Sequence, residues 1–290
     1  MTHKKILITG KNSYIGTALK NWLVAKDGYH VAEISLKDQG WQTVDFSQYD
    51  TVVHVAGIAH SDTKGADDET KARYYKINTD LTFDVATVAK KQGVKQFIFL
   101  SSIIVFSSNT GELNHHITSS TTPNPINFYG DSKLQAETKI KTLETTAFKI
   151  AIIRPPMVYG KGSKGNYPKL SKLATKVPFF PKVDNNRSMI HIDNLCQFLY
   201  LLIKNNDSGT YHPQNDAYVN TSQLVHTIRA VKGKKTVHLK GFAPMITALS
   251  KKQPLMEKLF SSVTYDQTMS AYKEPYCVRN FEESIALTEK

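Results

Sequence analysis

The feature that most constrains the fold is the start of the chain, where a strand, a glycine loop and a helix follow one another. Residues 5–9 form a short apolar run typical of a buried strand, and residues 17–24 carry apolar side chains at helical spacing. The loop between them begins with Gly10, which suits a tight turn, and ends with Gly16, which lets helix and strand pack closely. This order predicts a dinucleotide-binding unit, with the pyrophosphate at the helix N-terminus.

The middle of this loop departs from the usual glycine pattern. Ser13 stands where a glycine normally lets the backbone approach the phosphates, and its side chain is small enough to keep that approach open. We predict that a dinucleotide cofactor contacts the loop at Gly10, Lys11, Ser13, Tyr14, Ile15 and Gly16.

The end of the next predicted strand bears on which cofactor is used. The acid that binds the adenosine ribose of NAD is expected there, and the chain has Ser35 instead. Ser35, Lys37 and Lys11 could receive the 2′-phosphate of NADP, whereas Glu33 and Asp38 keep NAD open. The residues therefore leave the cofactor undecided between NAD and NADP.

The rest of the first half repeats the alternation of strand and helix. Apolar strands are predicted at residues 51–57 and 96–102, with a helix at residues 81–92 between them. Alternating strands and helices indicate an α/β fold, a doubly wound parallel sheet of the Rossmann type. Ligands of such a sheet bind at the carboxyl ends of its strands.

The alternation breaks after Gly160, which predicts a second, smaller lobe. Residues 161–168 form a basic, glycine-rich loop whose Lys, Asn and backbone donors suit a diphosphate. We expect a dinucleotide-binding domain at residues 1–160, to which the chain returns around residues 187–220. Residues 161–290 are expected to form mainly a substrate-binding lobe.

Tyr129 and Lys133 form the strongest candidate for chemistry. Four residues apart, they share one face of a helix and can act on one substrate. A phenol with its ordinary pKa of about 10 is a poor base near neutral pH. An adjacent ammonium group favours the phenolate, so this spacing predicts a proton-transfer pair.

With these pieces in order, the chain resembles the extended short-chain dehydrogenase/reductase family, in its nucleotide-sugar epimerase/dehydratase branch. The resemblance is carried by residues 9–16, 45–46, 54–57, 78, 101–102, 105–106, 129–133 and 154–160. It implies a catalytic set made of Ser102, Tyr129 and Lys133, with Ser101 as the alternative serine. Further cofactor contacts implied by the resemblance lie at Asp45, which would contact the adenine, and at Phe46, Ala56, Gly57, Asn78 and Pro155.

The activity implied by this resemblance is hydride transfer at C4 of a nucleotide-linked hexose, with UDP as the expected nucleotide. Tyr129 would move the proton, Ser102 would bind the same oxygen, and Lys133 would hold the nicotinamide ribose. The enzyme would be a UDP-glucose 4-epimerase-like protein or, alternatively, an NADPH-dependent 4-ketoreductase of a UDP-4-keto-6-deoxy sugar. Members of the family that dehydrate the sugar carry an Asp-Glu pair directly after the serine, where this chain has two isoleucines at residues 103–104, so the resemblance does not imply a 4,6-dehydratase. An alternative of another class is a catalytically inactive NADP-binding regulatory protein.

Several residues of the second half have expected roles in substrate binding or structure. Asn166 lies in the basic loop, and the resemblance implies that Arg187 binds the pyrophosphate, whose oxygens match its guanidinium fork. Asp193 is expected to cap a helix at residues 194–204, and His191 to be structural.

The net charge of +12 is spread along the chain. Lysine doublets occur at residues 4–5, 90–91, 234–235 and 251–252, and no long basic run is interleaved with aromatics. We therefore interpret the charge mostly as solvated surface and expect no nucleic-acid partner.

Other features exclude several classes of protein. Cys196 and Cys277, the two cysteines, lack metal-ligand spacing, so neither a disulfide framework nor a metal site is expected. The apolar runs are too short for a signal peptide or a membrane span, which predicts a cytoplasmic protein without membrane insertion.

Residues 109–127 are expected to form a loop, and residues 245–249 and 255–260 to be helical. The family resemblance implies a homodimer.

Overall fold

A computed structural model describes residues 3–59, 65–107, 114–176, 179–182, 184–239 and 261–290. The chain forms two compact units, each made of separate stretches. The first unit comprises Met1–Asn109, Thr122–Pro155 and Cys196–Pro213. The second unit comprises Thr110–Thr121, Pro156–Leu195 and Gln214–Lys290.

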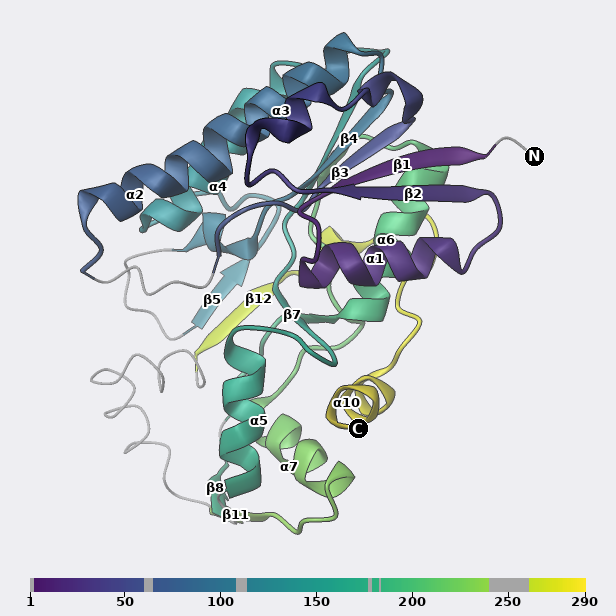
Figure 1. The fold of residues 1–290 in the computed structure, drawn as a ribbon. Coiled ribbons are helices and arrows are strands. Elements are labelled where there is room, and N and C mark those ends of the chain that lie inside the picture. The colour runs from purple at the N-terminus through teal and green to yellow at the C-terminus, as the bar shows by residue number, and fades with distance from the viewer. Residues whose placement is uncertain (1–2, 60–64, 108–113, 177–178, 183, 240–260) are drawn as a thin grey trace. The chain divides into compact units, whose positions relative to one another are not determined.

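The first unit is built on a six-stranded sheet in the order β10-β6-β4-β3-β1-β2, with every neighbouring pair parallel. Its strands are β1 (Lys4–Thr9), β2 (Tyr29–Ile34), β3 (Thr51–His54), β4 (Gln96–Leu100), β6 (Lys149–Ile153) and β10 (Gly209–Tyr211). Every residue of β3 and β4 is buried, as expected for central strands covered on both faces. The predicted doubly wound parallel sheet is confirmed (Figure 1).

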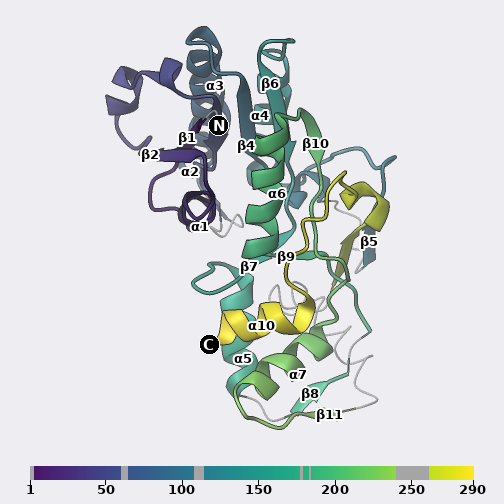
Figure 2. The same ribbon diagram turned by 90° about the vertical axis from the view of Figure 1, so that its right-hand side faces the viewer.

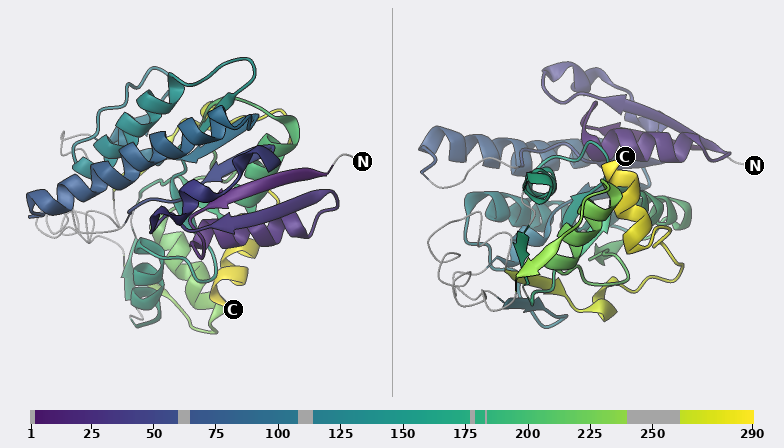
Figure 3. Two further views of the ribbon diagram at one scale, coloured as in Figure 1. Left: turned by 45° about the horizontal axis from the view of Figure 1, so that its top comes forward. Right: turned by 90° about the horizontal axis from the view of Figure 1, so that it is seen from below.

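Helices flank this sheet, and α3 runs beside α4 (Figure 3). They are α1 (Tyr14–Val24), α2 (Asp68–Tyr74), the π-helix η3 (Tyr75–Asp80), α3 (Leu81–Lys91), α4 (Phe128–Lys141) and α6 (Ile192–Asn205), with short 3-10 turns η1 (Gln39–Thr43), η2 (Phe46–Gln48) and η4 (Ile103–Phe106). The indole of Trp22 donates to Gln197 at 3.3 Å, which joins α1 to α6. Apolar side chains of α3 and α4, among them Val85 and Ile140, pack on the sheet around Phe97.

The first helix begins three residues earlier than the apolar period predicts. Ser13 is its N-cap, because the Ser13 Oγ accepts the backbone N–H of Gly16 at 3.2 Å. The residue in the place of the missing glycine therefore starts the helix, at Tyr14.

The second unit consists of short strand pairs and three helices within the described residues (Figure 2). The pairs are β7 (Met157–Tyr159) with β9 (Met189–His191), β8 (Phe179–Pro181) with β11 (Val237–Leu239), and β5 (Asn114–Ile117) with β12 (Ser262–Tyr265). The helices are α5 (Asn166–Lys176), α7 (Thr221–Val231) and α10 (Phe281–Glu289), with the 3-10 turn η5 (Gln267–Ser270). Tyr159, Leu170 and Ile228 lie in their shared core.

Three local predictions for the second unit are corrected. His115 and His116 belong to strand β5, not to a loop, because β12 pairs with them from about 150 positions later in the chain. The loop predicted at residues 161–168 ends early, since Asn166 already begins α5. Asp193 lies inside the first turn of α6, and its carboxylate binds Arg279 at 2.9 Å instead of capping the helix. The helices predicted at residues 245–249 and 255–260 lie outside the described residues.

Three further features concern the cysteines, membrane spans and metal sites. Cys196 and Cys277 are both free thiols, and Cys196 is buried. In the described part of the chain, no helix combines the length and apolar character that a membrane span requires. The same residues contain no group of His, Cys, Asp or Glu arranged to hold a metal ion.

Candidate active site

The candidate active site is assembled around the first two turns of α4. Asn127 caps this helix, because its Oδ1 accepts the backbone N–H of Gly130 at 2.9 Å. A Cβ added at Gly130 would lie 2.8 Å from the carbonyl oxygen of Ile104, so the helix start packs directly on η4. Tyr129 lies in the first turn of α4, and Lys133 lies one turn later.

Ser102 connects the segment after β4 to Tyr129. Its Oγ accepts the N–H of Ile104 at 3.3 Å, and its side chain lies close enough to Tyr129 to lower the pKa of that phenol. Ile103 donates its N–H to the carbonyl oxygen of Pro155 at 3.0 Å, which attaches the segment to the chain that follows β6. The structure thus brings together the serine and tyrosine that the sequence pairs.

The alternative serine, Ser101, has different partners. Its hydroxyl donates to Glu137 at 2.5 Å, and Glu137 accepts from Arg154 Nε at 3.0 Å and Nη2 at 2.6 Å. Glu137 is 1% exposed and Arg154 is 7% exposed, so this ion pair is buried. Ser102, not Ser101, is therefore the serine that faces Tyr129.

Burial dominates the protonation of Tyr129. Removal from water raises the pKa of Tyr129 to about 12, and the hydrogen bond from Ser102 only partly offsets this rise. We expected the ammonium group of Lys133 to lower this pKa, and that prediction is wrong for the protein alone. The phenol is consequently protonated at neutral pH.

Lys133 is held beneath the end of β4 with its side chain almost fully buried. Its Nζ donates to the carbonyl oxygen of Leu100 at 2.9 Å and lies 4.6 Å from the centre of the Phe99 ring. Burial lowers the pKa of Lys133 to about 8, although the carboxylate of Glu137 on the next turn opposes this lowering. An ammonium group has three donors, so the bond to Leu100 leaves donors for a ligand.

Asn78 fixes the loop after β3 against Lys133. Its Oδ1 accepts the N–H of Ile58 at 2.8 Å, and its Nδ2 donates to the carbonyl of Ile58 at 3.1 Å and to Ser132 at 3.1 Å. A Cβ added at Gly57 would lie 3.0 Å from Asn78 Oδ1 and 3.1 Å from Lys133 Nζ. The exposed Gly57 backbone therefore lies beside two functional side chains. Asn78 sits in the π-helix η3, a feature that is frequent at functional sites and that no sequence pattern indicated.

The glycine loop has the geometry that a dinucleotide requires. Gly10 adopts φ = +92°, and a Cβ there would lie 3.0 Å from the backbone nitrogen of Ala56. A Cβ at Gly16 would meet Ser13 Oγ at 2.6 Å and Val55 at 3.1 Å, so helix and strand approach as closely as expected. The loop residues therefore fit a nicotinamide dinucleotide, with its phosphates at the start of α1.

At the end of β2 one carboxylate is already paired, whereas Lys37 and Asp38 are both exposed. Glu33 pairs with Lys20 at 2.8 Å, and its side chain is 9% exposed. Asp38 accepts a backbone N–H at 2.9 Å and caps η1. The Oγ of Ser35 accepts the N–H of Lys37 at 3.3 Å, while the Lys37 side chain is exposed.

Asp45 and Phe46 occupy the turn before β3. Asp45 is exposed, and its Oδ1 accepts from the N–H of Ser47 at 3.0 Å and from the Ser47 hydroxyl at 2.6 Å. The Phe46 ring is fully buried, and its N–H donates to Gln92 at 2.6 Å. These contacts hold the turn in place and leave Asp45 as the accessible member of the pair.

The expected substrate ligands Asn166 and Arg187 belong to the second unit. The backbone of Arg187 pairs with Val219, and burial lowers the pKa of its guanidinium to about 10. Within the described residues, no carboxylate pairs with that guanidinium. Asn166 is the first residue of α5 and follows a loop in which Ser163 is 8% exposed.

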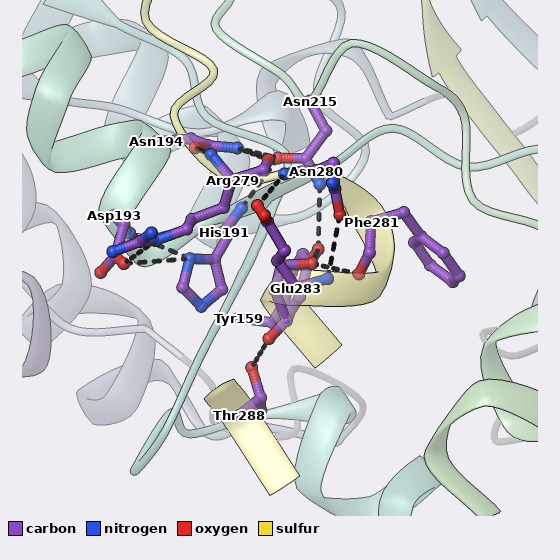
Figure 4. A network of polar contacts seen from close by, with 11 residues as sticks. Tyr159, His191, Asp193, Asn194, Asn215, Arg279, Asn280, Phe281, Glu283 and Thr288 are labelled. Atoms are coloured by element: carbon purple, nitrogen blue, oxygen red, sulfur yellow. Dashed lines mark hydrogen bonds and ion pairs between the residues drawn. The ribbon is translucent and has the colours of Figure 1, made fainter. Parts of the chain in front are cut away.

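The second unit also holds a buried polar network that no sequence pattern predicted (Figure 4). The Ser284 hydroxyl donates to the Phe281 carbonyl at 2.6 Å, so it accepts from the hydroxyl of Tyr159, 2.7 Å away. Tyr159 in turn accepts from Asn215 Nδ2 at 3.0 Å. Burial raises the pKa of Tyr159 to about 12.

This network extends to α6 and fixes the segment before α10. Asn215 Oδ1 accepts from Asn194 at 2.9 Å, and Asn194 Oδ1 accepts the N–H of Arg279 at 2.8 Å. His191 is 2% exposed, and its Nδ1 accepts the N–H of Asp193 at 3.3 Å. These contacts agree with a structural role for His191.

Comparison with known proteins identifies the family. Residues 4–270 match the family described as "RmlD substrate binding domain". A UDP-glucose 4-epimerase of Vibrio cholerae is 31% identical over 266 residues, which are 81% of this chain and 78% of the relative. The chain belongs to the extended short-chain dehydrogenase/reductase family.

Solved structures similar to this extended short-chain dehydrogenase/reductase share its fold over most of the chain. A UDP-glucuronic acid 4-epimerase of Bacillus cereus, in complex with NAD, has a TM-score of 0.73 at 17% identity, over 98% of this chain and 97% of that one. A dTDP-4-dehydrorhamnose reductase of Bacillus anthracis, in complex with NADP, has a TM-score of 0.65 at 22% identity, over 82% of this chain and 84% of that one.

Proposed function

We propose that the chain is an NAD(P)-dependent enzyme that acts at C4 of a nucleotide-linked hexose and epimerises it through a 4-keto sugar. The observation that carries this proposal is the grouping of Ser102, Tyr129 and Lys133. The Ser102 side chain opposes the rise in the pKa of Tyr129, and Lys133 lies one turn away and packs on Gly57. The similarity to a UDP-glucose 4-epimerase supports a UDP-linked hexose as the substrate.

The first unit supplies the groups that handle the proton. Tyr129 exchanges a proton with the oxygen on C4, and Ser102 donates a hydrogen bond to the phenol oxygen, which favours the phenolate. Lys133 adds positive charge close to this helix face when it is protonated. A nicotinamide cofactor, when bound, supplies the hydride acceptor and donor for C4.

The residues that would hold the cofactor come from four loops of the first unit. They are Gly10, Lys11, Ser13, Tyr14, Ile15 and Gly16 in the glycine loop, Ser35 and Lys37 after β2, Asp45 and Phe46 before β3, and Ala56, Gly57, Asn78, Tyr129, Lys133 and Pro155 around the active site. Because the Phe46 ring is in the core, Phe46 would contribute through its backbone.

The second unit would bind the nucleotide diphosphate. Arg187 carries a desolvated cation that no described carboxylate neutralises, and a pyrophosphate would compensate its charge. Asn166 would add an amide donor at the start of α5.

The second candidate is an NADPH-dependent 4-ketoreductase. Ser35 stands at the end of β2, Lys37 is exposed beside it, and Glu33 is already paired with Lys20. This arrangement favours a 2′-phosphate over a free ribose hydroxyl. Because Tyr129 is protonated at neutral pH, the free enzyme is also ready to donate a proton to a ketone.

The experiment that separates these candidates is identification of the cofactor released when the purified protein is denatured. NAD near one equivalent, with interconversion of UDP-glucose and UDP-galactose, supports the epimerase. Empty protein that binds NADPH preferentially and reduces a 4-keto sugar supports the ketoreductase. Binding of NADP without turnover indicates a regulatory protein, and failure to bind any nicotinamide cofactor overturns the proposal.

A matched pair of glycine variants tests whether the glycine loop holds the cofactor. Gly10 and Gly28 have φ = +92° and +86°, so alanine strains both backbones alike. Only the Cβ at Gly10 meets other atoms, at the backbone of Ala56. We expect Gly10→Ala to weaken cofactor binding by about 10-fold or more and Gly28→Ala to leave it unchanged, measured by fluorescence titration. Equal effects of the two variants would place the cofactor elsewhere.

A further inference from the structure

The second unit contains two stretches that carry basic residues and no acid. Residues 156–183 contain six lysines and neither Asp nor Glu. Residues 217–239 contain one arginine and three lysines, again without an acid. Residues 184–216 separate the two stretches, so the sequence alone does not show that they meet.

The fold brings these stretches together. Strands β8 and β11 pair in parallel, with Phe179 opposite Val237. Arg229 on α7 donates to the carbonyl of Ala174 on α5 at 2.7 Å, and the Nζ of Lys234 donates to the carbonyl of Thr175 at 3.0 Å. The C-terminal end of α5, the C-terminal end of α7 and the pair β8–β11 therefore form one region, which we call the basic end (Figure 2).

Lysines of α5 form an outward stripe that leads to the basic end. Their positions, 169, 172 and 176, repeat at intervals of three and four and so share one helix face. The opposite face is buried through Tyr167, Leu170 and Ala174. All three lysines are exposed, as are Lys182, Lys234 and Lys235.

Two apolar side chains stand exposed among these lysines. Phe179 is 55% exposed and Val237 is 50% exposed, whereas the next residue, Phe180, is 3% exposed. Register partners on adjacent strands project from the same face of a sheet. Phe179 and Val237 therefore form one apolar patch. The six exposed lysines around it pair with no described carboxylate, whereas the neighbouring Lys232 pairs with Glu289 at 2.9 Å.

We propose that the basic end binds the surface of a bilayer that contains anionic phospholipids. The lysines would contact headgroup phosphates, while Phe179 and Val237 would enter the interfacial region. A polyanion such as a nucleic acid would match the lysines but gains little from an exposed valine, whereas a bilayer surface matches both features. This is peripheral binding and does not rest on the proposed catalytic function.

The test is co-sedimentation of the full chain with vesicles. Phosphatidylcholine vesicles that contain about 30% phosphatidylglycerol are expected to bind the protein, and pure phosphatidylcholine vesicles to bind it at least about 10-fold more weakly. Raising the salt from about 0.05 to about 0.5 M should release most of the bound protein. Equal binding to both vesicle types, or none to either, overturns the proposal.

Charge variants locate the binding surface. The variant Lys176→Glu/Lys182→Glu/Lys235→Glu should lower the affinity for anionic vesicles by about 100-fold. The control variant makes the same charge change at three exposed lysines of the first unit, Lys76, Lys91 and Lys141. The control should bind almost as tightly as the parent chain. Equal losses in both variants would show an effect of net charge alone and would refute a specific basic end.

An apolar variant separates a bilayer from other polyanions. Phe179→Ser should weaken vesicle binding by about 10-fold, and Val24→Ser, which removes an apolar side chain that is 60% exposed in the first unit, should not. Thermal unfolding checks that each variant is folded. Binding of duplex DNA as tight as that of anionic vesicles, with neither affected by Phe179→Ser, would replace the proposal with a general polyanion site.

Discussion

Two buried tyrosines, one in each unit, share a perturbed pKa but differ in their partners. Burial raises the pKa of both Tyr129 and Tyr159 to about 12. Tyr159 is fully buried, donates to Ser284 and accepts from Asn215, so its hydroxyl is satisfied. Tyr129 is only partly buried, and Ser102 is the neighbouring side chain that favours its phenolate.

This difference shows that a shifted pKa alone does not mark a catalytic residue. Desolvation produces the same shift in both tyrosines. What distinguishes Tyr129 is its partial exposure and its place one helical turn from the buried Lys133, which lies beside the exposed backbone of Gly57. The partners and exposure of a side chain therefore say more about its role than its pKa does.

The comparison predicts opposite outcomes for the two phenol-to-phenyl substitutions. Tyr129→Phe should lower kcat by about 1,000-fold, because the general acid-base group is lost, with little change in stability. Tyr159→Phe should cost about 2 kcal/mol of unfolding free energy, because Asn215 and Ser284 each lose a buried partner. Turnover of the assigned sugar substrate and urea unfolding measure the two effects.

The outcome that would break the comparison is an active Tyr129→Phe variant. Retention of more than about a tenth of the parent kcat would remove Tyr129 from the proton-transfer step. Loss of activity in folded Tyr159→Phe protein would instead give the network of the second unit a role in catalysis.

The buried ion pair beside Lys133 should have a larger effect on stability than a surface pair. Glu137→Gln leaves Arg154 as a buried charge without its carboxylate, and we expect a loss of about 3 kcal/mol in unfolding free energy. Asp80→Asn is the matched control, because Asp80 pairs with Lys139 at 2.8 Å while both side chains are about half exposed. That control should cost less than about 1 kcal/mol. Similar losses in denaturant unfolding would mean that the Glu137 pair is solvated.

The sequence predicted the parts of the fold and site that depend on local patterns. The apolar runs of β1 and β4 and the positions of Gly10 and Gly16 follow from short-range rules of burial and turn geometry. The spacing of Tyr129 and Lys133 likewise required only the helical period.

The features that sequence reasoning missed depend on contacts between distant segments. The expected cap by Asp193 was overridden by Arg279, which lies 86 positions later. Strand β5 exists through its pairing with β12, and the π-helix around Asn78 carries no local signal. The basic end depends on the pairing of β8 with β11, because it joins two basic stretches that lie apart in the sequence.

The pH dependence of activity should sharpen the comparison of the two tyrosines, because Lys133 loses its proton in a pH range in which both phenols keep theirs. Burial lowers the pKa of Lys133 to about 8, so kcat should fall about tenfold per pH unit above that value as the ammonium is lost. Stability should respond in the opposite direction. The unfolded chain keeps this proton up to about pH 10.4, so between pH 8 and that value the unfolded state binds more protons and the contribution of Lys133 to stability rises with pH.

Two variants test whether the fall in kcat at alkaline pH, the alkaline limb of the pH profile, belongs to Lys133. Glu137→Gln removes the carboxylate that raises the pKa of Lys133, so the limb should move to lower pH, whereas Asp80→Asn should leave it in place. Lys133→Arg keeps its charge throughout this range and should remove the limb even where its kcat is reduced. A limb that stays near pH 8 in the arginine variant would belong to another group. In that case the role of Lys133 would be confined to holding Gly57 and Asn78 in place.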